Sequence, residues 1–285
     1  MVEIKSLANI DFDVLFESFA KAFADYEIQP NKAELQEMLH RRGFVPSLSF
    51  GAFDNGNLVS FTFNGIGFFN GVKTAYDTGT GTLKEYRGQG LASKVFNESI
   101  PFLVEVGIEQ YLLEVLQHNI SAVSVYRKQG FEVTREFNYF VQQMQDITPN
   151  SKSIHKDYSI CEVKLSDLAD ISNWWDFTPS WQNSFEAINR KPVDFIILGV
   201  KKDNIHVGYG ILEPSSGDIT QIAVDKNHRR KGVASAILKE LFKRNNYTSV
   251  KLINADISCV AITNLLEGNG IQLKGKQFEM IKKLS

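Results

Sequence analysis

Two short glycine turns are the sequence features whose residue types and spacing most clearly suggest chemistry. They read Arg87-Gly88-Gln89-Gly90-Leu91-Ala92 and Arg229-Arg230-Lys231-Gly232-Val233-Ala234. Each turn follows an extended segment and precedes an amphipathic segment with helical spacing. The unpaired amides at a helix start bind anions, glycine permits close approach, and the neighbouring basic side chains add positive charge. An ordinary helix cap would explain one such turn, but its repetition in the same context favours two anion sites.

Three kinds of anion-binding motif can be compared with these turns. A nucleotide-binding P-loop requires GxxxxGK followed by Ser or Thr, which neither turn supplies. A dinucleotide fingerprint matches Gly88 to Ser93 imperfectly, and the acidic Glu109 precedes its strand rather than ending it. The third pattern is Arg or Gln, two residues, Gly, one residue, and Gly or Ala. Both turns satisfy it without exception.

On this pattern the chain resembles the GNAT (GCN5-related N-acetyltransferase) superfamily, with one domain in each half. The turn of that family holds the pyrophosphate of coenzyme A, so the resemblance implies acetyl-CoA as co-substrate and no metal. It also implies an α/β (α+β) fold of two tandem GNAT-like domains, each with a mixed, mostly antiparallel twisted sheet flanked by helices. The implied cofactor contacts are Thr80, Gly81, Thr82, Leu83, Arg87, Gly88, Gln89, Gly90, Leu91, Ala92, Ser93, Asn119, Ile222, Ala223, Val224, Arg229, Arg230, Lys231, Gly232, Val233, Ala234 and Ser235.

The stretch from Tyr111 to Phe131 is similar to the corresponding stretch of GNAT enzymes that acetylate ribosomal-protein N-termini. By that resemblance, Glu114 is the general base, Tyr126 is the general acid, and Asn119 lines the cofactor. Acetyl transfer to an amine needs both proton transfers. Two plainer interpretations stay open: Tyr126 as a buried aromatic of an amphipathic helix, and Glu114 as a solvated or salt-bridged side chain.

The second copy serves as an internal control. Aligning Gly270 with Gly130 places Leu266 at the position of Tyr126 and Asn254 at the position of Glu114. The same alignment places Cys259 at Asn119. Both proton-transfer groups are absent from the second copy, so it either uses other residues or does no chemistry. Because it keeps its glycine turn, we expect catalysis in the first copy and a structural or regulatory second copy in which cofactor binding can survive.

The leading hypothesis is therefore an N-acetyltransferase acting on a primary amine of a small molecule or on a peptide N-terminus. The alternatives are a non-catalytic acyl-CoA-binding or sensor protein and, third, a dinucleotide oxidoreductase. Asp25, Glu27 and Asp77 are candidates for holding an acceptor ammonium. The chain is expected to be a monomer or a homodimer.

The elements that must position these residues occur twice in the same order. Each copy is expected to contain a strand, two helices, a hairpin, a strand leading into the glycine turn, a helix, a strand, a helix and closing strands. In the first copy the expected strands are 2–6, 47–53, 58–66, 76–83 and 110–115, and the expected helices with assigned ranges are 11–26, 32–42 and 120–128. In the second copy the expected strands are 159–164, 195–200, 206–212, 218–224 and 249–254, and the expected helices with assigned ranges are 167–175, 181–189 and 260–267. We predict domains at 1–145 and 158–285, joined by a polar linker at 146–157.

Composition narrows the choice of partners and compartment. With 31 Lys+Arg against 33 Asp+Glu, the chain has no basic excess to hold nucleic acid or an anionic membrane. Apolar runs are too short to span a bilayer, and the N-terminus lacks a signal pattern, so a cytoplasmic location is expected. Cys161 and Cys259 and the scattered histidines lack the spacing of metal ligands.

Overall fold

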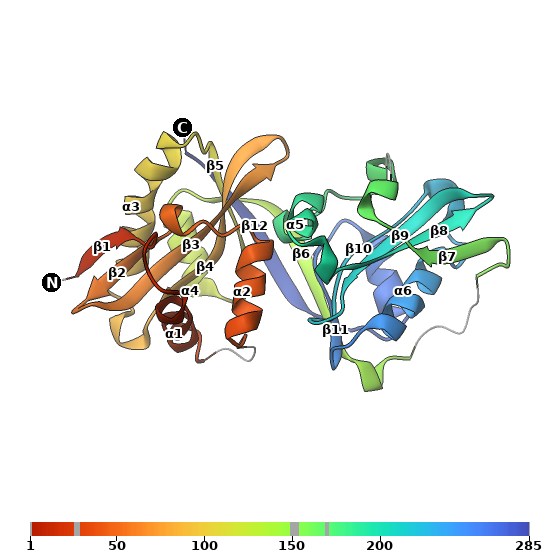
Figure 1. Cartoon of the computed structure of the whole chain (residues 1–285), viewed down its shortest axis with the longest axis horizontal. Helices are drawn as coiled ribbons and strands as arrows, with labels where there is room; N and C mark the ends of the chain where they lie inside the picture. Colours follow the sequence, from red (N-terminus) through yellow and green to blue (C-terminus); the bar gives the residue numbers. More distant parts are fainter. Residues whose placement is uncertain (1, 26–28, 149–153, 169–170, 285) are drawn as a thin grey trace.

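One twelve-stranded sheet runs through the whole chain in this computed structural model, which describes residues 2–25, 29–148, 154–168 and 171–284 (Figure 1). Residues 2–148 are called the N half and residues 154–284 the C half. The elements of the N half are β1 (Glu3–Ser6), α1 (Phe12–Ala22), α2 (Lys32–Arg41), β2 (Phe50–Asp54), β3 (Asn57–Phe69), β4 (Val72–Thr82), α3 (Leu91–Glu105), β5 (Gln110–Leu116), α4 (Ile120–Lys128) and β6 (Glu132–Gln143). This order agrees with the order expected from the sequence.

The C half repeats the order with shorter helices after its first strand. Its elements are β7 (Tyr158–Glu162), α5 (Phe185–Asn189), β8 (Ile196–Lys202), β9 (Ile205–Glu213), β10 (Asp218–Val224), α6 (Val233–Arg244), β11 (Ser249–Asp256), α7 (Val260–Glu267) and β12 (Leu273–Lys283). The helix expected at 167–175 is instead two 3-10 turns, Leu165–Asp167 and Ile171–Trp174. The helix expected at 181–189 is divided, because Ser184 caps α5 by accepting from the Ala187 amide and is itself extended.

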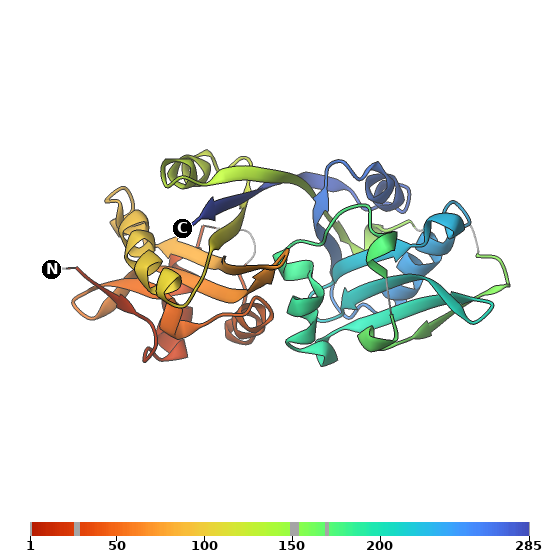
Figure 2. The same cartoon turned by 90° about the horizontal axis from the view of Figure 1, so that it is seen from above.

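The last strand of each half pairs with the other half. The sheet order is β1-β2-β3-β4-β5-β12-β6-β11-β10-β9-β8-β7. Strand β12 lies antiparallel to β5, with Gln277 opposite Leu116 and Lys283 opposite Gln110, and β6 lies antiparallel to β11. In Figure 2 the yellow-green β6 and the dark blue β12 cross between the halves, and the C-terminus lies over the N half. Each half is therefore completed by a strand of the other.

The predicted boundaries at 1–145, 146–157 and 158–285 stay a prediction. Residues 149–153 of the predicted linker, and the end of the helix expected at 11–26, lie outside the described residues. In the part of the chain that is described, the helices are too short and too polar to cross a membrane.

The glycine-rich strand β4 has a packing explanation. Gly79 and Gly81 point to the same face of the sheet, where a Cβ on Gly79 would lie 3.2 Å from the Phe19 ring. A Cβ on Gly81 would lie 2.6 Å from the Phe61 ring. Aromatic rings from α1 and β3 thus fill the space that side chains would occupy on an ordinary apolar strand, so the N half retains a packed core there.

A buried arginine fixes the contact between the halves on the side away from β6 and β12. Arg41, at the end of α2, has its Nη1 atom 2.8 Å from Asp218 Oδ2 and 3.3 Å from Glu213 Oε2. Its Nε and Nη2 atoms donate to the Gln182 carbonyl and the Asn183 side chain. Because a buried charge is tolerated only when it is paired and hydrogen-bonded, Arg41 specifies how α2 of the N half docks onto the C half.

The exchange of β6 and β12 makes folding of the halves interdependent. Expressed alone, residues 1–145 should aggregate, because β5 would present an unpaired edge where β12 belongs. Co-expression with residues 146–285 should give a soluble complex, measured by size-exclusion chromatography and circular dichroism. A soluble, cooperatively folding 1–145 fragment would contradict this prediction.

Candidate functional site

Two parallel strand pairs separate early, one in each half, and in the C half a cleft lies beside the separation. Strands β4 and β5 pair only from Thr74 opposite Gln110 to Tyr76 opposite Leu112. In the C half, β10 and β11 pair only at Asp218 and Lys251. The predicted site residues follow these last paired positions, so the sequence motifs lie where the sheet opens.

The glycine turns have the same backbone conformation in both halves. Gly88 and Gly90 have φ of 77° and 74°, and their counterparts Arg230 and Gly232 have φ of 61° and 83°. Gly90 and Gly232 are the N-caps of α3 and α6, whose first hydrogen bonds run from Lys94 and Ala236 back to them. The amides of the first helical residues, which come before Lys94 and Ala236, therefore have no partner within the helix and can donate to a ligand. A Cβ on Gly88 or Gly90 would meet no atom within 4 Å, which leaves room for a pyrophosphate.

The first arginine of each turn has an equivalent set of partners. Arg87 Nε donates to the carbonyl of Thr82 at 3.2 Å, and its Nη2 donates to the carbonyl of Ala22 at 2.8 Å. Its Nη1 lies 3.3 Å from Asp25 Oδ2. Arg87 thus ties the end of β4 to the end of α1 and engages Asp25, one of the predicted ammonium ligands; another, Glu27, lies outside the described residues.

Arg229 repeats this arrangement in the C half. Its Nε donates to the Val224 carbonyl at 3.1 Å, its Nη2 to the Trp174 carbonyl at 2.8 Å, and its Nη1 lies 2.9 Å from Asp176 Oδ1. Both arginines therefore have a structural role that sequence analysis missed, in addition to the predicted role at the rim of the cofactor site. Lys231 donates to the carbonyl of Asn227 at 2.8 Å.

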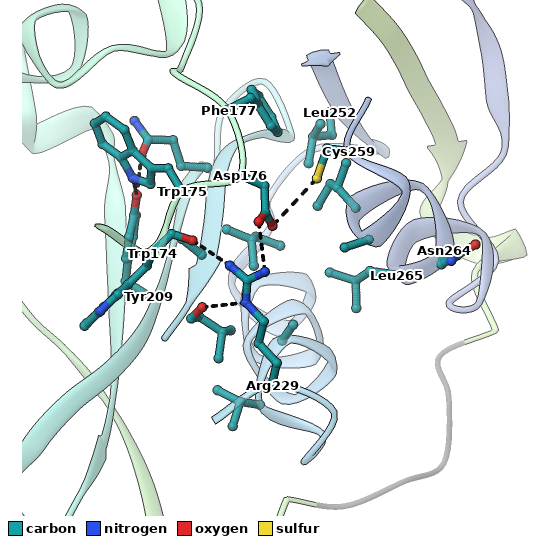
Figure 3. A pocket seen from close by; sticks show the side chains of 18 of the residues that line it. Trp174, Trp175, Asp176, Phe177, Tyr209, Arg229, Leu252, Cys259, Asn264 and Leu265 are labelled. Carbon is teal, nitrogen blue, oxygen red and sulfur yellow. Dashed lines mark hydrogen bonds and ion pairs between the residues drawn. The ribbon is translucent and has the colours of Figure 1, made fainter. Parts of the chain in front are cut away.

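A cavity of about 360 Å³ occupies the cleft of the C half (Figure 3). The predicted cofactor residues that line it are Ile222, Ala223, Val224, Arg229, Arg230, Gly232, Val233, Ala234 and Ser235. Trp174, Trp175 and Tyr209 form an aromatic wall on one side, and Cys259 and Leu265 lie on the side of α7 (Figure 3). Burial raises the pKa of the Cys259 thiol, so this cysteine is a lining residue rather than an activated nucleophile.

Tyr126, the predicted acid, lies at the opening between β4 and β5. Its hydroxyl donates to Asp77 Oδ2 at 3.2 Å. The same carboxylate accepts from the Thr80 hydroxyl and from the Gly79 amide at 2.8 and 2.9 Å. Burial raises the pKa of Asp77 to about 6 against these hydrogen bonds, which favour the charged form. Sequence analysis considered Asp77 only as an ammonium ligand, and the structure makes it the partner of Tyr126.

Glu114, the predicted base, lies in the middle of β5 and is half-buried. Its Oε2 accepts a short hydrogen bond from the Tyr76 hydroxyl, and its Oε1 accepts from the Asn254 amide at 3.2 Å. Burial, helped by the charge of Glu279, raises the pKa of Glu114 to about 7, although the hydrogen bond from Tyr76 and the charge of Arg42 oppose the shift. Such a carboxyl can exchange a proton near neutral pH.

Other predicted contacts take local roles. Asn119 is the N-cap of α4 and accepts from the Ala122 amide at 3.2 Å. Thr80, Gly81 and Thr82 pair with β3, and the Leu83 amide donates to Val59. Among the residues that the structure describes, no three His, Cys, Asp or Glu side chains are grouped to hold a metal ion.

The helix ends of the two copies confirm how their residues correspond. The Tyr126 carbonyl accepts from the amides of Gln129 and Phe131, and the Leu266 carbonyl accepts equivalently from Asn269 and Ile271. Leu266 is fully buried in the core of the C half. A side chain without a proton to donate therefore occupies the position of Tyr126 in the second copy.

Comparison with known proteins gives a family match over most of the chain. The sequence model of the acetyltransferase (GNAT) family matches residues 12–131 and 156–252. The chain is similar to N-alpha-acetyltransferase MAK3 of Arabidopsis thaliana, with 30% identity over 100 residues that cover 35% of this chain and 53% of the relative. It thus spans about half the length of that relative. N-alpha-acetyltransferase 30 of Schizosaccharomyces pombe is 30% identical over 119 residues, 40% of this chain and 79% of that protein.

A solved structure shares the whole architecture. A tandem GNAT protein from the clavulanic acid biosynthesis pathway, solved without acetyl-CoA, superposes with a TM-score of 0.75 at 12% identity. The superposition covers 100% of this chain and 99% of that one. At this identity the likeness shows a shared tandem fold.

The equivalent arginines provide a test of their structural role. Arg87→Met and Arg229→Met should each lower the free energy of unfolding by about 1–3 kcal/mol, because each change leaves two carbonyls and a carboxylate without their donor. Urea unfolding followed by circular dichroism measures the loss, with the exposed Arg127→Met as control. Wild-type stability in both variants would show that these contacts do not stabilise the fold.

Proposed function

Because the chain belongs to the acetyltransferase (GNAT) family, we propose that its N half transfers an acetyl group from acetyl-CoA to a primary amine of a small molecule or a peptide N-terminus. One observation carries this assignment. Tyr126 and Glu114 flank the point where β4 and β5 separate, and each is hydrogen-bonded to a neighbouring residue of β4, Asp77 or Tyr76. A proton donor and a proton acceptor are thus both anchored to β4, next to the point where it separates from β5.

The proposed reaction is direct attack of the amine on the thioester carbonyl. Glu114 takes the proton that the amine nitrogen loses, directly or through a water, as its new bond to the acetyl carbon forms. The carbon–sulfur bond then breaks, and the Tyr126 hydroxyl gives its proton to the departing thiolate. The raised pKa of Glu114, about 7, matches the first task. The Tyr126 hydroxyl donates to Asp77 in this structure, so the O–H turns from that carboxylate to the thiolate for the second task.

The proposed acceptor follows from the names of the relatives and from the local charge. Both curated relatives are N-alpha-acetyltransferases, which favours a peptide N-terminus as one acceptor class. Asp77 and Glu114 are two carboxyls next to the point where β4 and β5 separate, and either can attract an ammonium group before it loses its proton.

A second function is proposed for the C half, namely binding of acyl-CoA without catalysis. The observation in its favour is the cavity of about 360 Å³ that reaches the second glycine turn. Leu266 and Asn254 occupy the positions of Tyr126 and Glu114, so the cleft lacks the pair that moves protons in the proposed reaction. Saturable acetyl-CoA binding to the chain, with no turnover on any amine or peptide, would make binding the function of the whole protein.

Removal of one hydroxyl tests the proposed acid. Tyr126→Phe should lower kcat by roughly 10²-fold, because the thiolate would leave without its proton donor, while KM for acetyl-CoA changes little. Thiol release over a panel of amines and N-terminal peptides measures this, with the exposed Tyr247→Phe as control. Undiminished turnover in Tyr126→Phe would exclude the assigned role.

The proposed base should give the pH profile of kcat a limb on its acidic side. Glu114 acts only when ionised, so with its pKa near 7 kcat should rise as the pH is raised through about 7 and should fall below it. Glu114→Gln should remove this limb and lower kcat by roughly 10²-fold at pH 8. The matched control is Glu109→Gln, an exposed carboxyl just before the same strand. A limb that persists in Glu114→Gln would assign the base to another group.

A further inference from the structure

A segment of the C half, Ser180 to Asn183, is buried against the site of the N half. The Trp181 ring stacks on the Tyr76 ring with centroids 5.2 Å apart and planes 9° apart. Its Nε1 donates to the Arg42 carbonyl at 3.0 Å. These contacts hold the ring of Tyr76, whose hydroxyl donates to Glu114. The surroundings of the proposed base are thus supplied in part by the half that lacks a base of its own.

Asn254 makes the direct connection. Its Nδ2 donates to Glu114 Oε1 at 3.2 Å and to Ser180 Oγ at 2.9 Å. The residue is 1% exposed and has φ of 59°, within a break in the pairing of β11 with β6 between Leu252 and Ala255. The irregularity turns the strand so that one amide reaches across β12 and β6 to the other half. Asn254 also lines the cavity of the C half.

We propose that Asn254 of the C half is a positioning residue for Glu114 of the N half. Through its amide donor and the Ser180 contact, it fixes the orientation of the Glu114 carboxylate beside the point where β4 and β5 separate. The proposal rests on Glu114 being the base, as argued above. The second copy then contributes to catalysis at the position equivalent to Glu114, although an amide cannot act as a base.

Several titratable or charged side chains face Glu114 from the elements packed around it. Tyr76 comes from β4, Glu279 from β12, Arg135 from β6 and Arg42 from the end of α2. Arg135 is itself paired with Glu279, with Nη2 and Oε2 2.6 Å apart. The Asn254 side chain donates to Glu114 and Ser180 rather than to these groups, so we expect a change of proton affinity at Glu114 to report the lost amide donor.

The test measures protonation of Glu114 in the full chain. Asn254→Gly removes the amide without backbone strain, because glycine readily adopts a positive φ. Since a donor to the carboxylate favours its charged form, the midpoint of the Glu114 titration should rise by roughly one pH unit. Asn254→Asp, which replaces the donor with a like charge, should raise it further. Carbon-13 NMR of labelled glutamate gives the midpoint, and the Glu114→Gln spectrum identifies the resonance.

The acidic limb of kcat should move with the NMR midpoint. Asn138→Ala serves as control, because Asn138 is another buried asparagine and lies on β6 opposite Ala255. Wild-type midpoints in both Asn254→Gly and Asn254→Asp would overturn the proposal, as would an equal shift in Asn138→Ala. Failure of the proposed function would look different: Glu114→Gln would retain its activity, while the NMR midpoints would still report on Asn254.

Discussion

The hydrogen bonds that join β12 to β5 and β6 to β11 are the constraint on which the rest of the structure depends. In each half a parallel strand pair separates, because β5 pairs with β4 only up to Leu112 and β11 pairs with β10 only at Lys251. Strands β5 and β11 are each held on the other edge by the last strand of the opposite half. The pairing of β12 with β6 then links both points of separation through one continuous sheet.

The two copies share a scaffold and differ in chemistry. Arg87 ties the end of β4 to the end of α1, and Arg229 ties the end of β10 to Trp174. Each guanidinium donates to two backbone carbonyls and pairs with one aspartate. The left-handed turn residues also correspond, although Arg230 replaces Gly88. These common features place a helix start after the separating strand in each half, whereas the side chains nearby differ. Tyr126 and Glu114 meet Asp77 and Tyr76 in the N half, and Leu266 is packed into the core in the C half.

Burial of carboxyl groups sets the electrostatics of the proposed catalytic site. Removal from water raises the pKa of Glu114 to about 7 and that of Asp77 to about 6, and the charge of Arg42 opposes both shifts. Arg42 is kept at the junction because its Nη2 donates to Gln182 at 2.8 Å and its carbonyl accepts from Trp181. The proton affinity of the N half therefore depends on residues that the C half positions.

The sequence by itself determined the repeated order of elements, the two glycine turns and the family resemblance, which the family match confirms. The strand at 218–224 and the helices at 120–128 and 260–267 agree with their predicted ranges, because hydrophobic periodicity and capping residues act locally. Local patterns also aligned Leu266 with Tyr126, and the equivalent helix ends support that alignment.

Only the tertiary structure decided which strand lies beside which, and therefore which residues meet at the site. An exchanged strand and a retained strand have the same alternating pattern, so the sequence could not place β12 beside β5. Sequence analysis considered Asp77 only as an ammonium ligand and Asn254 only as the replacement of a glutamate, because the partners of both residues are distant in the chain. Asn254 is 140 residues from Glu114, and only the packing of the two halves brings its amide to that carboxylate.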